Sequence, residues 1–175
     1  MRSATTQECT EPMGQSRNAV ESLGLIGVIS DTHGLLRPEA LEALKGVDLI
    51  LHAGDIGNSQ VLEALQSIAP VMAVRGNNDR GEWAAELPEW EVVEVGAVNV
   101  YMLHDVKEIN LNPAAEGFQV VVSGHSHKPS VEERKGVLYV NPGSAGPRRF
   151  RLPVSVARLR INGESVIAEL VELST

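Results

Sequence analysis

The sequence contains a single cysteine, Cys9, among its 175 residues. One thiol cannot form an internal disulfide, and a zinc cluster of thiolates needs several. A cysteine phosphatase would carry its nucleophile in the pattern C-x5-R, but the first arginine after Cys9 is Arg17. We therefore interpret Cys9 as an incidental thiol in a polar stretch.

Positive charge and long apolar runs are also scarce. The chain has 15 Lys and Arg against 23 Asp and Glu, which gives a formal charge of −8. This balance argues against a nucleic-acid coat protein and against a protein drawn to anionic membranes. No stretch approaches the roughly 18 apolar residues of a membrane helix. We expect no stable nucleic-acid partner, no membrane association and a cytoplasmic location.

The first 23 residues differ in composition from the rest. They are rich in Ser, Thr, Glu, Gln and Gly, and they lack the apolar centre of a signal peptide. Such a segment buries too little apolar surface to offset the entropy of ordering it. We expect a disordered leader over 1–23, with a short helix over 17–23. One domain would then occupy 24–175, a length typical of a single domain.

The first half of this domain alternates apolar runs with helical patterns. Strands are predicted over 25–30, 48–52 and 71–74, each ending at a polar or glycine-containing loop. A helix over 37–45 and a second one capped by Ser59 follow the first two strands. Three strand–loop–helix units in succession predict a parallel sheet with right-handed crossovers.

The second half is richer in strands. Hairpins are predicted over 91–103, 131–141 and 152–173, and a single strand over 118–123. The turn of the last hairpin is placed at Asn162-Gly163, a strong turn signal. No linker separates the halves, so the sequence predicts one mixed α/β domain.

Polar side chains gather where the predicted strands end. Four of the five histidines lie in these stops, and the fifth, His52, lies inside a strand and is expected to be a core residue or to support a ligand. The carboxyl ends of parallel strands form one edge, where ligands bind in α/β sheets. Seven candidate ligands could converge there: Asp31, His33, Asp55, Asn77, His104, His125 and His127.

The donor types of this set indicate a transition-metal site. Nitrogen and oxygen donors without sulfur suit Mn, Fe, Ni or Zn better than Mg or Ca. Seven protein ligands are too many for one catalytic ion that keeps an open position. They suit two ions about 3.5–4 Å apart, bridged by one carboxylate. Two dications against two carboxylates favour an anionic substrate, and a phosphate ester is the natural one.

The ordered motifs resemble those of a known family. Asp31-x-His33, Gly54-Asp55, the run from Gly76 to Asp79, His104 and Gly124-His-Ser-His127 look like the five motifs of the calcineurin-like metallophosphoesterases. The length and the trailing Asn-Pro-Gly-Ser run resemble the small prokaryotic, YfcE-like phosphodiesterase branch. The resemblance implies a four-layer α/β/β/α sandwich of two mixed sheets flanked by helices, with the metals at its strand-end edge.

Ligand roles follow from the same resemblance. One ion would be held by Asp31, His33, Asp55 and His127. The other would be held by Asp55, Asn77, His104 and His125, with Asp55 as the bridge. We expect two divalent ions per chain, Mn²⁺ first and Ni, Fe or Zn as alternatives.

Two positions depart from the family pattern. The phosphatase branch has a histidine at the position of Asn78, where it protonates the leaving group, and an asparagine amide cannot act as a general acid. The fourth motif usually continues with glycine, whereas this chain has Asp105. Its carboxylate could orient a ligand, but we expect it to face solvent. Asn78, His104 and Asp55 are the predicted catalytic residues. Three arginines are candidate phosphate contacts: Arg75, Arg148 and Arg149.

The predicted function is a phosphodiesterase that hydrolyses a small phosphate ester by in-line attack of hydroxide held at a two-metal centre. The alternative is a catalytically weak interaction scaffold, since a eukaryotic retromer subunit resembles the same fold. His104-Asp105 also suggests the His-Asp phosphohydrolases, but these resemble an all-helical fold and the residues before His104 have strand character. A homo-oligomer stays an open alternative.

Overall fold

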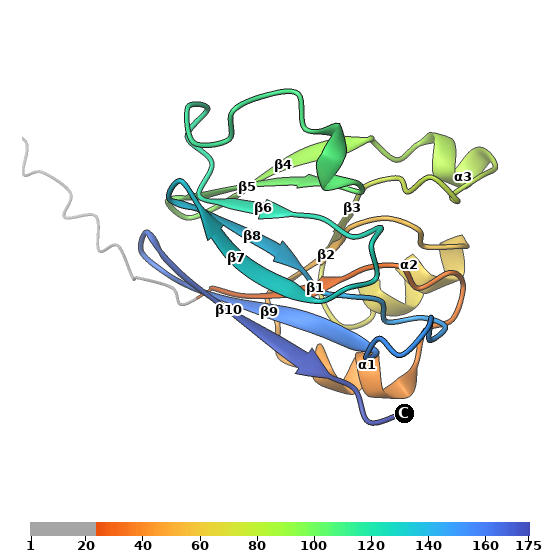
Figure 1. Cartoon of the computed structure of the whole chain (residues 1–175). Helices are drawn as coiled ribbons and strands as arrows, with labels where there is room; N and C mark the ends of the chain where they lie inside the picture. Colours follow the sequence, from red (N-terminus) through yellow and green to blue (C-terminus); the bar gives the residue numbers. More distant parts are fainter. Residues whose placement is uncertain (1–23) are drawn as a thin grey trace, which may run out of the picture.

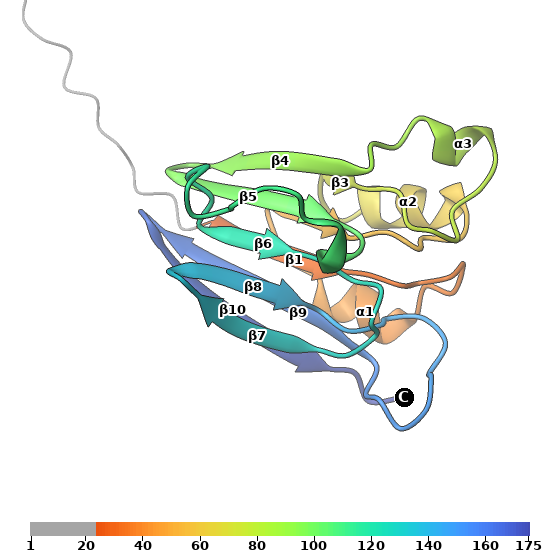
Figure 2. The same ribbon diagram turned by 45° about the horizontal axis from the view of Figure 1, so that its top comes forward.

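The computed structural model describes residues 24–175. The predicted leader over 1–23, its short helix and Cys9 lie outside the described residues. Two five-stranded sheets pack face to face (Figure 1, Figure 2). The first contains β1 (Gly24–Ile29), β2 (Leu49–His52), β3 (Val71–Ala73), β9 (Ser155–Asn162) and β10 (Ser165–Glu172). The second contains β4 (Trp90–Val95), β5 (Val98–Leu103), β6 (Val120–Val122), β7 (Ser130–Arg134) and β8 (Val137–Asn141).

Both sheets are mixed. The first has the order β10-β9-β1-β2-β3. Its strands β1, β2 and β3 are parallel, and β9 pairs antiparallel with both of its neighbours, β1 and β10. The second has the order β4-β5-β6-β8-β7, in which β5, β6 and β8 are parallel. The parallel strands of both sheets therefore end at one edge of the molecule, on the right in Figure 1. The predicted parallel trio and all three hairpins are confirmed.

The main core fills the space between the sheets. Ile26 and Val28 of β1 point into it, while Ile29 belongs to a second core on the other face of the sheet. In the second sheet, Val100 and Met102 of β5 point inward in the same way. This alternation follows from the two-residue period of a strand. Strands buried on both faces explain the continuous apolar runs in the sequence.

The outer faces of the two sheets are covered differently. The first carries α1 (Pro38–Ala43) and α2 (Ser59–Gln66), whose apolar faces pack on β1 and β2. The second is covered by the 3₁₀ helix η1 (Val106–Glu108) and by apolar side chains of the irregular segment 109–119. The predicted four-layer α/β/β/α sandwich is confirmed, with one short 3₁₀ helix in its fourth layer. No described helix is long and apolar enough to cross a membrane.

The N-cap of α2 and the turn of the last hairpin each lie one residue away from their predicted positions. Asn58, not Ser59, is the N-cap of α2, because its side-chain oxygen accepts the backbone N–H of Val61 at 3.2 Å. In the last hairpin Asn162 still pairs with Ser165, so the two-residue turn is Gly163-Glu164. The helix α3 (Glu82–Ala85) was not predicted. It is one turn long, too short for a periodic pattern.

Candidate metal centre

The seven candidate ligands come from loops that follow β1, β2, β3, β5 and β6. Five of them have left-handed backbone, with φ of 55° at Asp31, 47° at His33, 53° at Asp55, 67° at His125 and 60° at His127. Such a conformation costs a non-glycine residue about 1–3 kcal/mol and is concentrated at functional sites. The fold holds these side chains in conformations that the isolated chain would avoid.

The first cluster contains Asp31, His33 and His127. The Nε2 atoms of the two histidines lie 3.3 Å apart, and their rings are stacked. Asp31 Oδ1 lies 3.2 Å from His127 Nε2 and 3.9 Å from His33 Nε2. Its other oxygen accepts hydrogen bonds from the Ser30 hydroxyl and the His125 backbone N–H. Three ligand atoms thus converge within 4.8 Å of one another.

The second cluster contains Asn77, His104 and His125. Asn77 Oδ1 lies 3.0 Å from His104 Nε2 and 3.1 Å from His125 Nδ1. The other ring nitrogen of His104, Nδ1, lies 2.7 Å from the carbonyl oxygen of Ala53, to which it donates. This contact fixes the tautomer and leaves the Nε2 lone pair directed at the site.

Asp55 lies between the two clusters. Its Oδ2 is 3.8 Å from His33 Nε2 and 3.5 Å from His104 Nε2. Asn78 donates to the same carboxylate twice, from its backbone N–H at 2.8 Å and from its side-chain amide at 2.6 Å. Burial alone would raise the pKa of Asp55, but the contact with His104 in its protonated form and the hydrogen bonds from Asn78 outweigh it and hold the pKa well below its usual range.

Unpaired lone pairs show that this donor set suits a cation. Among the described residues, Asp31 Oδ1 and His127 Nδ1 are buried side-chain atoms without a hydrogen-bond partner. In its neutral form, His104 directs the Nε2 lone pair at the side-chain oxygens of Asn77 and Asp55. These contacts then join two hydrogen-bond acceptors with no proton between them. A proton or a metal ion between them removes the conflict. Burial lowers the pKa of His104, yet the Asp55 and Ala53 oxygens raise it by more.

Glycines let the ligand loops approach one another. A Cβ on Gly76 would lie 2.1 Å from the backbone nitrogen of Asp55, and one on Gly124 would lie 1.9 Å from Ser30 Oγ. The sequence motifs contain these glycines because no side chain fits at these positions. The close packing of each ligand loop against the neighbouring loops therefore fixes its position.

Two supporting residues were not singled out from the sequence. The carboxylate of Asp79 is buried and accepts the backbone N–H groups of Gly57 at 2.9 Å and Gly76 at 2.8 Å. The amide of Asn141 donates to Gly124 O at 2.8 Å, next to the two histidines of the last motif. Both lie in recognised runs, Asn-Asn-Asp and Asn-Pro-Gly-Ser, which were the available signals.

His52 is a core residue, as expected. Its Nε2 lies 2.9 Å from Thr32 Oγ1, which itself donates to the Ile56 carbonyl, and its Nδ1 accepts the Gly54 N–H. These contacts fix a neutral ring with its proton on Nε2. Complete burial lowers the pKa of His52 to about 3.

The two departures from the family pattern both lie against ligands. Asn78 binds Asp55, as described above. One oxygen of Asp105 caps η1 through the Lys107 N–H, and the other lies 3.6 Å from His125 Nε2. Asp105 is partly buried beside a ligand, so the expectation that it faces solvent is wrong.

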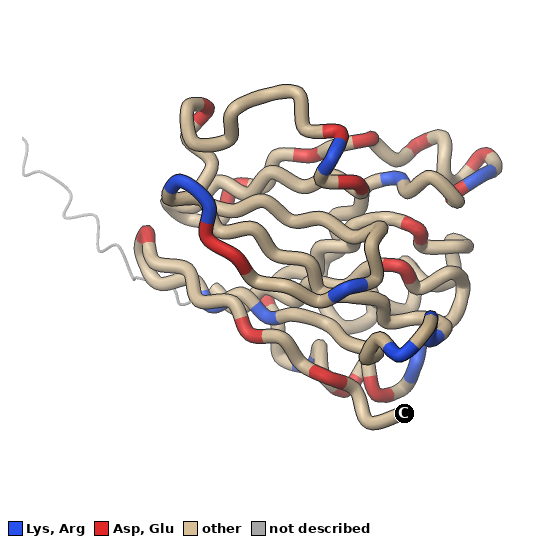
Figure 3. The backbone as a smooth tube through the Cα atoms, viewed as in Figure 1, with Lys and Arg blue, Asp and Glu red and all other residues tan. Residues whose placement is uncertain are grey.

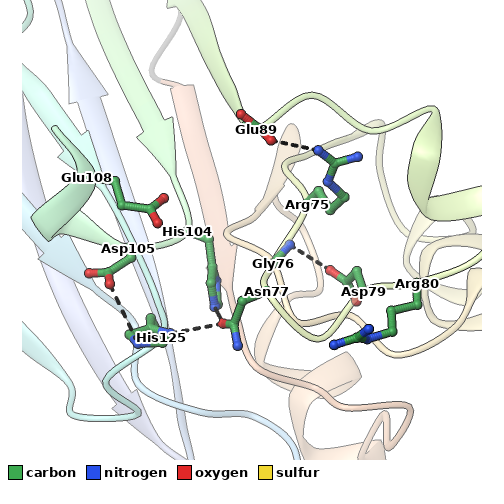
Figure 4. A pocket seen from close by; sticks show the side chains of 10 residues that line it. All are labelled: Arg75, Gly76, Asn77, Asp79, Arg80, Glu89, His104, Asp105, Glu108 and His125. Atoms are coloured by element: carbon green, nitrogen blue, oxygen red, sulfur yellow. Dashed lines mark hydrogen bonds and ion pairs between the residues drawn. The ribbon is translucent and has the colours of Figure 1, made fainter. Parts of the chain in front are cut away.

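The three candidate arginines lie in different surroundings. Arg75 is paired with Glu89 at 2.8 Å and lines an open pocket of about 580 Å³ beside Asn77, His104 and His125 (Figure 4). The Arg149 charge helps to lower the pKa of His33, after burial, which is the larger cause. Arg148 donates to the Thr175 hydroxyl at the end of the chain. Arg75 and Arg149 therefore flank the clusters, whereas Arg148 contacts the C-terminal residue.

Comparison with known proteins agrees with this arrangement. Residues 25–164 match the calcineurin-like phosphoesterase superfamily domain. The chain belongs to this superfamily. A probable metallophosphoesterase of Methanothermobacter thermautotrophicus is 38% identical over 159 residues, which cover 84% of this chain and 91% of the relative. The resemblance stated from the motifs is confirmed.

Solved structures show the same fold. Phosphodiesterase YfcE of Escherichia coli is 29% identical over 174 residues, covering 81% of this chain and 94% of YfcE. Its structure matches with a TM-score of 0.60 at 25% identity, over 86% of this chain and all of that one. Vacuolar protein sorting 29 of Cryptosporidium parvum matches with a TM-score of 0.75 at 22% identity, over 87% and 92% of the two chains. That second likeness shows the fold alone.

Proposed function

We propose that residues 24–175 form a metal-dependent phosphodiesterase domain that binds two divalent cations at the clusters joined by Asp55. The observation that carries this proposal is the set of unpaired acceptors in both clusters. Asp31 Oδ1 has no hydrogen-bond partner among the described residues, and the lone pairs of His104 Nε2 and Asn77 Oδ1 face each other. The names of the relatives, metallophosphoesterase and phosphodiesterase, support the same chemistry.

Two cations, when bound, supply positive charge for the phosphoryl oxygens and lower the pKa of water. Asp31, His33, Asp55 and His127 would hold one of them, and Asp55, Asn77, His104 and His125 the other. Asn78 keeps the carboxylate of Asp55 ionised and oriented through two hydrogen bonds. The Ala53 carbonyl fixes the ring of His104, and Arg149, whose charge acts on His33, is the candidate contact for a phosphoryl oxygen.

Features outside the clusters favour a diester. The pocket beside the second cluster is open, so both ester groups of a substrate have room. Asn78 offers no proton for a basic leaving group, so an acidic alcohol or phenol is the better one. Mn²⁺ as the preferred ion and a cytoplasmic location belong to the same proposal.

The test combines metal content and turnover. The protein is stripped with a chelator, titrated with Mn²⁺ and assayed with bis-p-nitrophenyl phosphate. We expect two equivalents of Mn²⁺ and hydrolysis that rises with them. Asp55→Asn should weaken both sites, because Asp55 touches both clusters. Asp48→Asn, at the opposite end of β2, is the matched control and should keep both.

The outcomes separate the rival functions. One tightly bound equivalent with no second would contradict the bridged pair. Two equivalents without hydrolysis of any phosphate ester, under any of the four metals, would favour the interaction scaffold over the enzyme.

A further inference from the structure

Positive φ singles out a residue that takes no part in the metal centre. Seven non-glycine residues of 24–175 have positive φ. Five are the candidate ligands named above, and the sixth, Lys135, is in the two-residue turn between β7 and β8. The seventh is Phe150, with φ of 55°. A bulky aromatic residue in this region is a genuine outlier.

Burial does not account for the strain at Phe150. Its side chain is 92% exposed, against 57% for Trp90 and 63% for Ile167, the next most exposed large apolar residues. An exposed ring gains nothing from the hydrophobic effect that could offset the strained backbone. Strain of this kind points to a function when the surrounding structure enforces it.

The loop that carries Phe150 is anchored at its start to the metal-binding loop. The Ala145 N–H donates to Ser30 O at 3.0 Å, and the Ser144 hydroxyl donates to Asp31 O at 2.9 Å. Arg37 donates to Gly146 O at 3.2 Å. A Cβ on Gly146 would lie 2.3 Å from the Thr32 carbonyl, so this part of the chain is in close contact with the strand-end edge.

The tip of the loop is a closed turn. The Leu152 N–H donates to Arg149 O at 3.2 Å, which places Phe150 at the first corner of a four-residue turn. Arg148, just before the turn, is tied to Thr175. Phe150 lies four positions after Gly146, so the two Cα atoms are at most about 14 Å apart. The ring therefore projects into solvent from a loop that is anchored to the strand-end edge.

The charge of the loop differs from that of the molecule. The chain carries −8 overall, yet Arg148, Arg149 and Arg151 surround Phe150. Figure 3 shows these basic segments together at the corner where the chain ends. An anionic ligand at the metal centre would meet positive charge on this side.

We propose that the turn over 149–152 recognises a nucleotide phosphodiester, with the Phe150 ring stacking on the nucleobase and Arg149 facing the phosphate. This inference rests on the proposed function and names its substrate class. A nucleobase offers a flat π-face to an aromatic ring, and its phosphate complements an arginine. A ring held away from the chain's own core, in an arginine-rich turn on a loop anchored to the metal-binding loop, can provide the first contact, and the neighbouring guanidinium the second.

The test compares two esters with the same leaving group. The p-nitrophenyl ester of thymidine 5′-monophosphate carries a nucleobase, and methyl p-nitrophenyl phosphate does not. In wild type, kcat/KM should favour the nucleotide ester. Phe150→Ala should reduce that preference about 5- to 50-fold, since stacking on one base has about this effect. Phe150→Trp should restore it, and Ile167→Ala, an exposed apolar control on β10, should leave it unchanged.

A second readout needs no turnover. The added indole of Phe150→Trp should lose fluorescence on addition of adenosine monophosphate but not of methyl phosphate. Hydrolysis of both esters with the same preference in wild type and Phe150→Ala, or no selective quenching, would overturn this inference alone. Loss of binding to anionic vesicles in Phe150→Ala, with the preference unchanged, would assign the ring to a membrane and also overturn it. Failure of wild type to hydrolyse either ester would overturn the proposed function as well.

Discussion

The neutral, fully buried His52 makes stability depend on pH. In the folded chain its pKa is lowered to about 3 by burial, against 6.5 for the free side chain. Below pH 6.5 the unfolded chain binds a proton that the folded chain does not bind. The free energy of unfolding therefore falls as pH falls from 6.5 towards 3. Between pH 7.5 and pH 4.5 the loss from this one group is about 3 kcal/mol.

The assay is urea unfolding of chelated protein at several pH values between 4.5 and 7.5. His52→Gln keeps a donor for Thr32 and removes the titration. We expect this variant to be less stable than wild type at pH 7.5, by about 1–3 kcal/mol, because the Gly54 N–H loses its acceptor. The difference should disappear, or change sign, at pH 4.5.

Thr32→Val is the matched control, since it breaks the same contact and keeps the buried imidazole. It should lower stability at both pH values and retain the full pH dependence of wild type. Parallel curves for wild type and His52→Gln would refute the reasoning, because the acid sensitivity would then belong to other groups.

Two substitutions and one series of substrates test the metal centre further. Gly76→Ala puts a Cβ 2.1 Å from a backbone nitrogen. It should abolish turnover and cost about 3 kcal/mol in thermal unfolding, whereas Gly96→Ala, with open space around it, should cost about 1 kcal/mol and keep turnover. Asp105→Asn weakens the acceptor beside His125 and should lower the affinity of one Mn²⁺ by about 10- to 100-fold in calorimetry; unchanged affinity would leave Asp105 only its helix cap. The Asn78 amide is bound to a carboxylate and cannot release a proton. The barrier should therefore rise by up to about 1.4 kcal/mol for each unit of leaving-group pKa, so that log kcat/KM falls steeply as this pKa increases. A flat plot would identify another proton donor.

The candidate ligands could be predicted from the sequence more completely than the hydrogen bonds that support them. Strand ends are local features, since each apolar run stops at a polar residue such as Asp31 or His104. Parallel topology then brings these stops to one edge without further information. This is why all seven candidate ligands could be named and why the structure brings them into two adjoining clusters.

The supporting contacts depend on distances in space that a local pattern does not contain. Asp79 accepts the N–H of Gly57, 22 positions earlier, and Asn141 fixes a carbonyl 17 positions earlier. Asn78 illustrates the same limit. Its chemistry as a poor acid was clear from the sequence, but its attachment to Asp55 follows from how two loops meet. The exposure of Phe150 is likewise a property of the loop's anchoring, because its sequence alone resembles an ordinary charged turn.

Metal removal should leave the fold intact, because backbone contacts hold the ligand loops. The Asp31 N–H donates to Gly54 O at 3.0 Å, the His33 N–H to Asp55 O at 2.9 Å, and the Gly124 N–H to His104 O at 2.9 Å. None of these contacts needs an ion, and the main core lies between the sheets, away from the edge. Each ion present at 100 times its dissociation constant adds about 2.7 kcal/mol, so two ions add about 5 kcal/mol, which corresponds to about 10–20 °C in a domain of this size. Chelated protein should therefore melt about 10–20 °C lower, in one cooperative transition and with an unchanged far-UV spectrum. Loss of cooperativity on chelation would show that the ions, and not the hydrogen bonds between loops, hold this edge together.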